Sequence, residues 1–194
     1  MLKPIFAEFS AVHFRKAIQS TLCISLAILT VLVLPGWTVT SVGDSGREYR
    51  LRLYHTHTNE RIDIVYRRGE NYVPSAVDRL DEFLRDHRTG DVHALDPHLF
   101  DILHDLAVAV GKPESEIDIV CGYRTPWSNE FLRRTTVGVA AHSLHMEGEA
   151  IDIRIPGVNT LALRNAAVTL HRGGVGYYPE SKFVHVDVGP VRWW

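Results

Sequence analysis

Two short stretches in the C-terminal third of the chain alternate apolar and polar residues with the period of a β-strand. In Phe183–Gly189 the three valines point to one face, so His185 and Asp187 share the other face. In Glu149–Ile155 the three isoleucines define a core face, which leaves Asp152 on the outward face. If these strands are neighbours in one sheet, Asp152 and His185 can converge.

The segment Ser143–Asp152, SLHMEGEAID, places a histidine seven residues before Asp152. Gly148 can supply a turn and Ala150 leaves room, so the segment can fold back and deliver His145 to the same place. Two imidazoles and one carboxylate form the ligand set of a catalytic zinc ion, which keeps its fourth position open for water. The spacing alone leaves two interpretations open, a metal site and a set of unrelated polar groups on the surface.

The pattern S-x-H-x-x-G-x-A-x-D is matched in full from Ser143 to Asp152 and is followed by an H-x-D pair near the C-terminus. In these motifs the chain resembles the D-alanyl-D-alanine metallopeptidase family and, within it, the YcbK-like group. The resemblance runs from about Arg50 to the C-terminus and includes GYR at 122–124, HRGGVGYYP at 171–179 and FVHVD at 183–187.

The resemblance implies a zinc ion held by His145, Asp152 and His185, and hydrolysis of peptide bonds in bacterial cell-wall peptides. It also implies that Arg124, from the GYR motif, lies in the site. There a guanidinium can grip a substrate carboxylate or the oxyanion of a tetrahedral intermediate.

The sequence departs from the family at the general base. Many relatives carry an acidic residue three positions before the last ligand, or a histidine two positions before it, where this chain has Lys182 and Phe183. Neither side chain takes a proton from zinc-bound water in the same way. We therefore expect Asp187 to be the catalytic base, and a second role stays open for it as the partner that orients His185. If Asp187 only orients, the glutamates of SLHMEGEAID are the next candidates.

The remaining pattern predicts an α+β fold. Period-two runs on both sides of HTHTNE predict a β-hairpin over 49–66. Further strands are predicted over 116–121 and as a closing pair around Pro179. Helices are predicted from Ser75 as N-cap to about Arg88, from Asp96 to Gly111, near 128–134, and from Asn159 as N-cap to about Arg172. The resemblance implies an antiparallel sheet with flanking helices, as in hedgehog domains and D,D-peptidases.

The N-terminus predicts export. Basic residues precede the uncharged apolar run Leu22–Leu34. A helix of this length spans about 20 Å, less than the ~30 Å of a hydrocarbon core, which fits the central region of a secretory signal. Because no charge appears between Gln19 and Asp44, an inner-membrane anchor through residues 20–42 is the alternative. We expect residues 1–45 to be this signal or anchor plus a linker, and residues 46–194 to be a zinc peptidase domain in the periplasm.

The net charge and the cysteine content limit the partners and the disulfide bonds that can be expected. The net charge of −2 gives no reason to expect nucleic acid or an anionic membrane surface as a partner. Cys121 is the single cysteine after the export segment, so it has no partner for an internal disulfide, and we expect it to pack in the core.

We therefore expect a zinc-dependent murein peptidase whose partner is peptidoglycan. The resemblance implies an endopeptidase that cuts cross-links between stem peptides, including links between two diaminopimelate residues. The alternatives are a zinc D,D-carboxypeptidase or dipeptidase that acts on D-Ala-D-Ala ends, and a non-catalytic wall-binding domain that keeps the metal.

Overall fold

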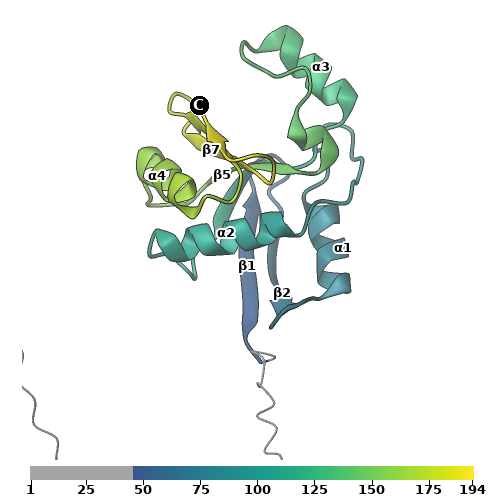
Figure 1. The fold of residues 1–194 in the computed structure, drawn as a ribbon. Helices are drawn as coiled ribbons and strands as arrows, with labels where there is room; N and C mark the ends of the chain where they lie inside the picture. The colour runs from purple at the N-terminus through teal and green to yellow at the C-terminus, as the bar shows by residue number, and fades with distance from the viewer. Residues whose placement is uncertain (1–45) are drawn as a thin grey trace, which may run out of the picture. The chain divides into compact units, whose positions relative to one another are not determined.

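A single mixed β-sheet runs through the part of the chain that the computed structural model describes, residues 46–194 (Figure 1). The predicted export segment, residues 1–45, lies outside the described residues, and the boundary near residue 45 stays a prediction. Among residues 46–194, no helix is both long enough and apolar enough to span a membrane.

The sheet has eight strands in the order β3-β2-β1-β4-β5-β7-β6-β8. The strands are β1 (Glu48–His55), β2 (Arg61–Arg68), β3 (Asn71–Tyr72), β4 (Ile117–Cys121), β5 (Ala150–Arg154), β6 (Gly174–Tyr178), β7 (Phe183–Asp187) and β8 (Arg192–Trp193). Two neighbouring pairs, β1 with β4 and β6 with β8, are parallel, and the other pairs are antiparallel. The predicted α+β class is confirmed, with a sheet that is mixed rather than wholly antiparallel. The parallel β1–β4 pair needs a long connection, and this connection contains β2, β3 and two α-helices.

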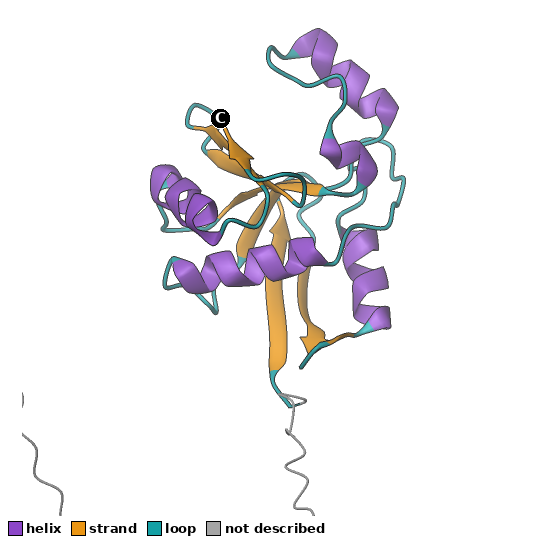
Figure 2. Ribbon diagram, viewed as in Figure 1, coloured by secondary structure: helices purple, strands orange, loops and turns teal. Residues whose placement is uncertain are grey.

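Within residues 46–194, four α-helices and one 3₁₀ helix accompany the sheet. Figure 2 shows how they are arranged around it. They are α1 (Pro74–Phe83), α2 (His98–Ala109), α3 (Pro126–Thr135), the 3₁₀ helix η1 (Leu144–Glu147) and α4 (Thr160–Leu170). The hydrophobic core is built from the sheet together with α1, α2 and α4, and its largest fully buried side chains include Tyr66 and Phe100. Ile151 and Ile153 of β5 and Val184 and Val186 of β7 point into this core, as the alternation predicts.

The helix at Pro74 differs from its prediction at both ends. Val73 is the N-cap, and the side chain of Ser75 caps nothing, because Pro74 already occupies the first turn with the φ that a helix needs. The helix ends at Phe83 rather than near Arg88. Beyond it the chain turns away, because the carboxylate of Asp86 accepts hydrogen bonds from backbone and side-chain groups of the following loops.

The predicted N-cap of α4 is confirmed. The side-chain oxygen of Asn159 accepts hydrogen bonds from the backbone N–H of Leu161 at 2.9 Å and of Ala162 at 3.4 Å. These contacts satisfy two of the donors that a helix leaves unpaired at its N-terminus.

The two caps give a matched test of this difference. Asn159→Ala removes a real cap, so we expect the free energy of unfolding to fall by about 1 kcal/mol. Ser75→Ala removes no cap hydrogen bond and serves as the control, with no measurable change. Urea denaturation of both variants measures the difference, and equal losses would contradict the assigned start of α1.

Candidate metal centre

The centre of the site is the pairing of β5 with β7. These strands are antiparallel neighbours, and their register sets Asp152 directly opposite His185. The strands are thus neighbours, which is the condition under which the sequence lets Asp152 and His185 converge. The face that the sequence labels outward is nevertheless buried, since Asp152 is 6% exposed and His185 is 8% exposed. The segments that lead into β5 cover this face and carry the third polar group.

His145 reaches the same place from η1. Gly148 ends η1 with a φ of 70°, in the left-handed region, and a Cβ there would lie 2.4 Å from the carbonyl oxygen of Ala94. Only glycine meets both conditions without strain, so the predicted turn at Gly148 is confirmed. Ala150 is the first residue of β5 and is fully buried, so its small side chain fits the limited room at this position.

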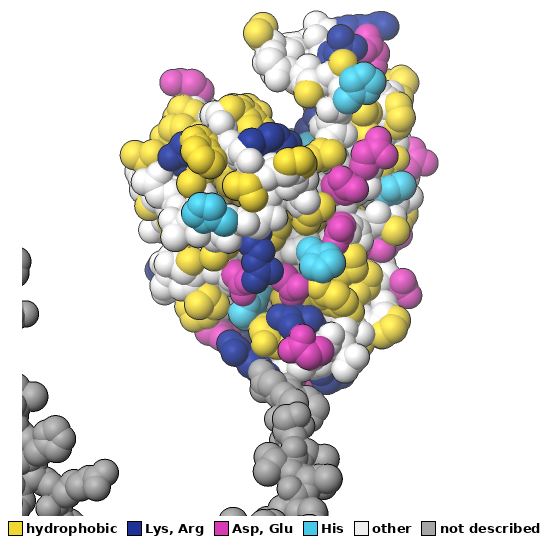
Figure 3. All heavy atoms as spheres, viewed as in Figure 1, with side chains coloured by type: hydrophobic (Ala, Val, Ile, Leu, Met, Phe, Trp, Pro, Cys, Tyr) yellow, Lys and Arg dark blue, Asp and Glu magenta, His cyan; other side chains and the backbone are white. Residues whose placement is uncertain are grey.

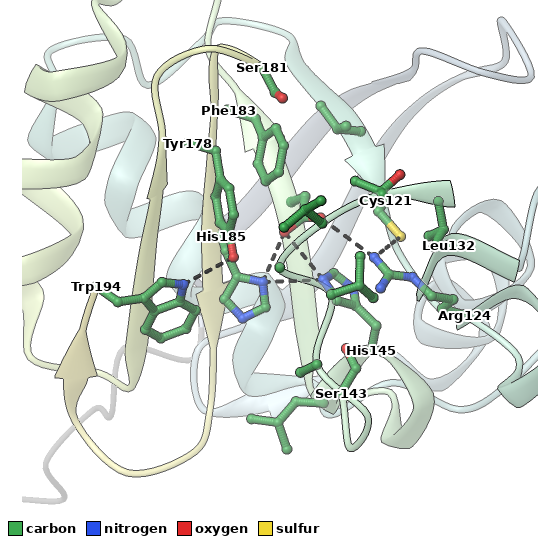
Figure 4. Close-up of a pocket in the computed structure, with 18 of the residues that line it drawn as sticks. Cys121, Arg124, Leu132, Ser143, His145, Tyr178, Ser181, Phe183, His185 and Trp194 are labelled. Carbon is green, nitrogen blue, oxygen red and sulfur yellow. Dashed lines mark hydrogen bonds and ion pairs between the residues drawn. The ribbon is translucent and has the colours of Figure 1, made fainter. Parts of the chain in front are cut away.

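Three side-chain atoms converge at the point where η1, β5 and β7 meet (Figure 4). The Nε2 atom of His145 lies 3.2 Å from Oδ1 of Asp152 and 3.2 Å from Nδ1 of His185. The Nδ1 atom of His185 lies 2.9 Å from the same carboxylate oxygen. Two ligands bound to a tetrahedral zinc ion at about 2.05 Å are roughly 3.3 Å apart. The three atoms are therefore spaced almost as ligands of one ion.

Each imidazole is held by its far nitrogen. Nδ1 of His145 donates to the carbonyl oxygen of Gly122 at 2.8 Å, and Nε2 of His185 donates to Oδ2 of Asp187 at 3.2 Å. An acceptor on the far nitrogen keeps a proton there and leaves the near nitrogen free for a metal. The two rings are thus prepared for ligation through different nitrogens, Nε2 in His145 and Nδ1 in His185.

The buried charges of the site depend on one another. Burial raises the pKa of Asp152, but the charge and hydrogen bond of His145, and then those of His185, outweigh it and hold the pKa well below its usual range. Burial lowers the pKa of His145, and the charge of Asp152 outweighs it and raises that pKa to about 10. The Asp152 carboxylate therefore attracts positive charge to this point, which a metal cation can supply in place of protons.

Cys121 lies beside His145 and Asp152. The sequence predicts that it packs in the core. Donor atoms of Cys121, His145 and Asp152 lie within 4.8 Å of one another. The register shifts between Ile119 and Cys121, so that Ile119 pairs with Ile153 while Cys121 pairs with Asp152. This irregularity turns Cys121 from the core face to the site face. The expected burial of Cys121 is confirmed, but its thiol lies beside the site rather than among the core side chains.

Arg124 lies in the site, as the resemblance implies. Its guanidinium is buried, donates from Nη1 to Oδ1 of Asn129 at 3.1 Å and from Nη2 to the sulfur of Cys121 at 3.4 Å. Nη2 also lies 3.9 Å from Oδ2 of Asp152. The side chain is anchored against the wall of the site, with its positive charge next to Asp152.

Asp187 lies on the far side of the His185 ring. Its buried carboxylate accepts hydrogen bonds from Gly174 N at 2.8 Å, Gly189 N at 2.9 Å and Arg192 Nη2 at 2.7 Å, besides the contact with His185. Burial raises its pKa, but His185, Arg192 and Gly174 outweigh this and lower the pKa to about 2. These contacts favour the orienting role. The base role stays a prediction that the geometry does not favour.

A cavity of about 440 Å³ opens over the three converging atoms. Its wall includes Tyr178, Phe183 and Trp194 on one side and the loop 136–143 with Leu132 of α3 on another. Figure 3 shows a hollow between the part that carries α3 and the C-terminal strands, with basic side chains beside it. Among the described residues that line the cavity, Asp152 is the only carboxylate, so neither glutamate of SLHMEGEAID reaches it.

A stacked histidine pair, which the sequence did not reveal, forms another part of the wall. The rings of His57 and His87 lie 4.1 Å apart and are inclined by 5°, next to Arg88. Burial lowers the pKa of both rings, that of His87 to about 4, and the charge of Arg88 lowers them further. The pair is therefore neutral at pH 7, and the positive charge here belongs to Arg88. Pairing between residues thirty apart leaves no signal in the spacing of one sequence.

Comparisons with a family model and with known proteins point to the same family. Residues 44–194 match the family described as "Peptidoglycan L,D-endopeptidase MepK". The chain is 38% identical over 166 residues to the probable peptidoglycan L,D-endopeptidase MepK of Haemophilus influenzae, which covers 86% of this chain and 89% of that protein. It is 39% identical over 144 residues to peptidoglycan L,D-endopeptidase MepK of Escherichia coli, which covers 74% of this chain and 79% of that protein.

Proposed function

The chain belongs to the peptidoglycan L,D-endopeptidase MepK family, and from this premise we propose that it is a zinc-dependent murein endopeptidase that hydrolyses cross-links between stem peptides. One structural observation supports this proposal independently of family membership. Nε2 of His145, Oδ1 of Asp152 and Nδ1 of His185 converge within 3.2 Å of one another on the wall of a cavity.

Zinc fits this donor set, because two imidazole nitrogens and one carboxylate oxygen with an open fourth position are typical of catalytic zinc sites. When bound, zinc lowers the pKa of its water to about 7 and polarises the scissile carbonyl. The protein's part is to hold the ligands. Gly122 and Asp187 orient the two imidazoles, and the buried charge of Arg124 stabilises negative charge that develops nearby.

Arg88 supports an acidic peptide as the substrate. Stem peptides carry free carboxylates, and among the described residues no carboxylate lies within ion-pair distance of the Arg88 guanidinium. The same charge also favours the second candidate, a D,D-carboxypeptidase, because such an enzyme must bind a terminal carboxylate. The endopeptidase is preferred because the relatives are named as endopeptidases.

The substrate also supports export. Peptidoglycan lies outside the inner membrane, so the domain must act in the periplasm, reached through a cleaved signal or an anchor within residues 1–45. We name no further partner, and nucleic acid is not expected from the charge of the chain.

Muropeptide digestion tests the function. The zinc-loaded protein should convert dimers joined by a diaminopimelate–diaminopimelate bond into monomers. A chelator should stop the reaction and added zinc should restore it, because the ligands remain in place. Release of terminal D-alanine without loss of dimers would identify a carboxypeptidase. Binding of the dimers without any product would identify a wall-binding domain.

The ligand set has its own test. His145→Ala, Asp152→Ala and His185→Ala each remove a proposed ligand, so the purified variants should lose zinc on dialysis. Cys121→Ala is the matched control, because it removes a neighbouring donor that the proposal leaves out, and it should keep its zinc. Elemental analysis gives the metal content. Loss of zinc from Cys121→Ala to the same extent as from Asp152→Ala would make the thiolate a ligand.

Asp187→Asn separates the two roles of Asp187. If the carboxylate orients His185, zinc affinity and turnover should fall together by about 10–100-fold. If it is the base, turnover should fall by about 10²–10⁴-fold with zinc affinity unchanged. From the contacts of Asp187 we expect the first result, measured by competition with a chromophoric chelator and by kcat. Glu147→Gln changes an exposed carboxylate of the same motif region and should match the wild type in both measurements.

A further inference from the structure

Strand β6 brings two aromatic rings to the side of His185. Gly176 of β6 pairs directly with His185 of β7, and it has no side chain to fill the space next to the imidazole. A Cβ at Gly176 would lie 2.8 Å from Cε2 of Tyr178 and 2.8 Å from Cζ2 of Trp194. Both rings therefore lie over Gly176, on the face of the sheet that carries His185 (Figure 4).

The Tyr178 ring is fixed on both sides. It stacks on Phe183 with ring centres 4.5 Å apart and an angle of 17°. Trp194 is held in turn by backbone hydrogen bonds to Val175 and Tyr177, and its ring lies 5.4 Å from the ring of His185. The packing of the ring therefore fixes the position of the Tyr178 hydroxyl group.

The polarity of one hydrogen bond decides what this hydroxyl can do. Nε1 of Trp194 lies 3.0 Å from Oη of Tyr178, and an indole nitrogen can only donate. Oη is therefore the acceptor, and the hydroxyl proton is not used in this contact. Within residues 46–194 the Tyr178 hydroxyl has no other hydrogen-bond partner, and Tyr178 lines the cavity above the three converging atoms.

We propose that Tyr178 is a catalytic residue whose hydroxyl donates a hydrogen bond to the oxyanion that forms when the scissile carbonyl is attacked. This role rests on the proposed peptidase function and adds a residue to it. A donor held in place before the reaction stabilises the developing charge without reorganisation. The indole N–H of Trp194 strengthens the donor, because hydrogen bonds in a chain polarise one another. Arg124 supplies charge from a second direction, so the tyrosine needs only to donate.

The test compares Tyr178→Phe with Tyr177→Phe. The first variant removes only the hydroxyl and keeps the stacking on Phe183. The second removes a hydroxyl from the neighbouring position of the same strand, which pairs with the core residue Val184 and does not line the cavity. Tyr178→Phe should lower kcat on cross-linked muropeptides by about 10²-fold with KM and zinc content unchanged. Tyr177→Phe should behave as the wild type.

A binding measurement keeps this test independent of turnover. In a phosphinic analogue of the cross-link, a PO₂–CH₂ unit replaces the scissile bond and presents the oxyanion geometry. Calorimetry on the zinc-loaded proteins should show about 10²-fold weaker binding to Tyr178→Phe than to the wild type, with equal binding of the reaction product.

Equal affinity of the two proteins for the phosphinate, with equal kcat, would overturn the role of Tyr178. If the wild type cleaves no muropeptide but binds the phosphinate in a Tyr178-dependent manner, the peptidase proposal and the catalytic role fail together, and Tyr178 is a hydrogen-bond donor to a bound anion only.

Discussion

The buried carboxylate of Asp152 is the interaction on which the rest of the site depends. An isolated charge in the interior of a protein is unstable, and this one is kept ionised by two imidazoles and a guanidinium within 4 Å. The imidazoles in turn need acceptors on their far nitrogens, and the backbone of Gly122 and the carboxylate of Asp187 provide them. A divalent cation would satisfy the same charge with the same atoms.

Small residues admit the elements that carry these groups. Gly148 allows η1 to turn against the Ala94 backbone, and Gly176 leaves the space beside His185 to two aromatic rings. A Cβ at Gly173 would lie 1.8 Å from the backbone carbonyl oxygen of Asp187, and a Cβ at Gly174 would lie 2.4 Å from its Oδ2 atom. Because both residues are glycines, the chain passes close enough for the backbone N–H of Gly174 to donate to the Asp187 carboxylate. The side chains of the site are therefore positioned by backbone that approaches closely where glycine permits it.

Regular alternation made the centre of the site predictable, and irregular backbone hid its surroundings. Period two in β5 and β7 assigns Asp152 and His185 each to the outward face of its strand, and the structure adds that the two strands are neighbours. The cap at Asn159 follows from its residue type. Cys121 is buried as expected, but its position beside the site was not predictable, because a register shift has no signature in the sequence of β4. The burial of the site face and the stacking of His57 on His87 depend on segments far apart in sequence, so neither was predicted. The cap expected at Ser75 does not form, because Pro74 before it already starts the helix.

The charges around the cavity are compensated unequally. Arg192 is neutralised by Asp187 on the far side of His185, and Arg124 is turned toward Asp152 and Cys121. The positive charge of Arg88 has no such partner among the described residues, and the histidines next to it are neutral at pH 7. Since charged groups of one sign in a concave site attract ligands of the opposite sign, the charge of Arg88 favours an anionic ligand before it contacts the three converging atoms. The proposed roles therefore fall to separate groups on different parts of the cavity wall, substrate recognition to Arg88 and bond cleavage to the converging atoms with Tyr178.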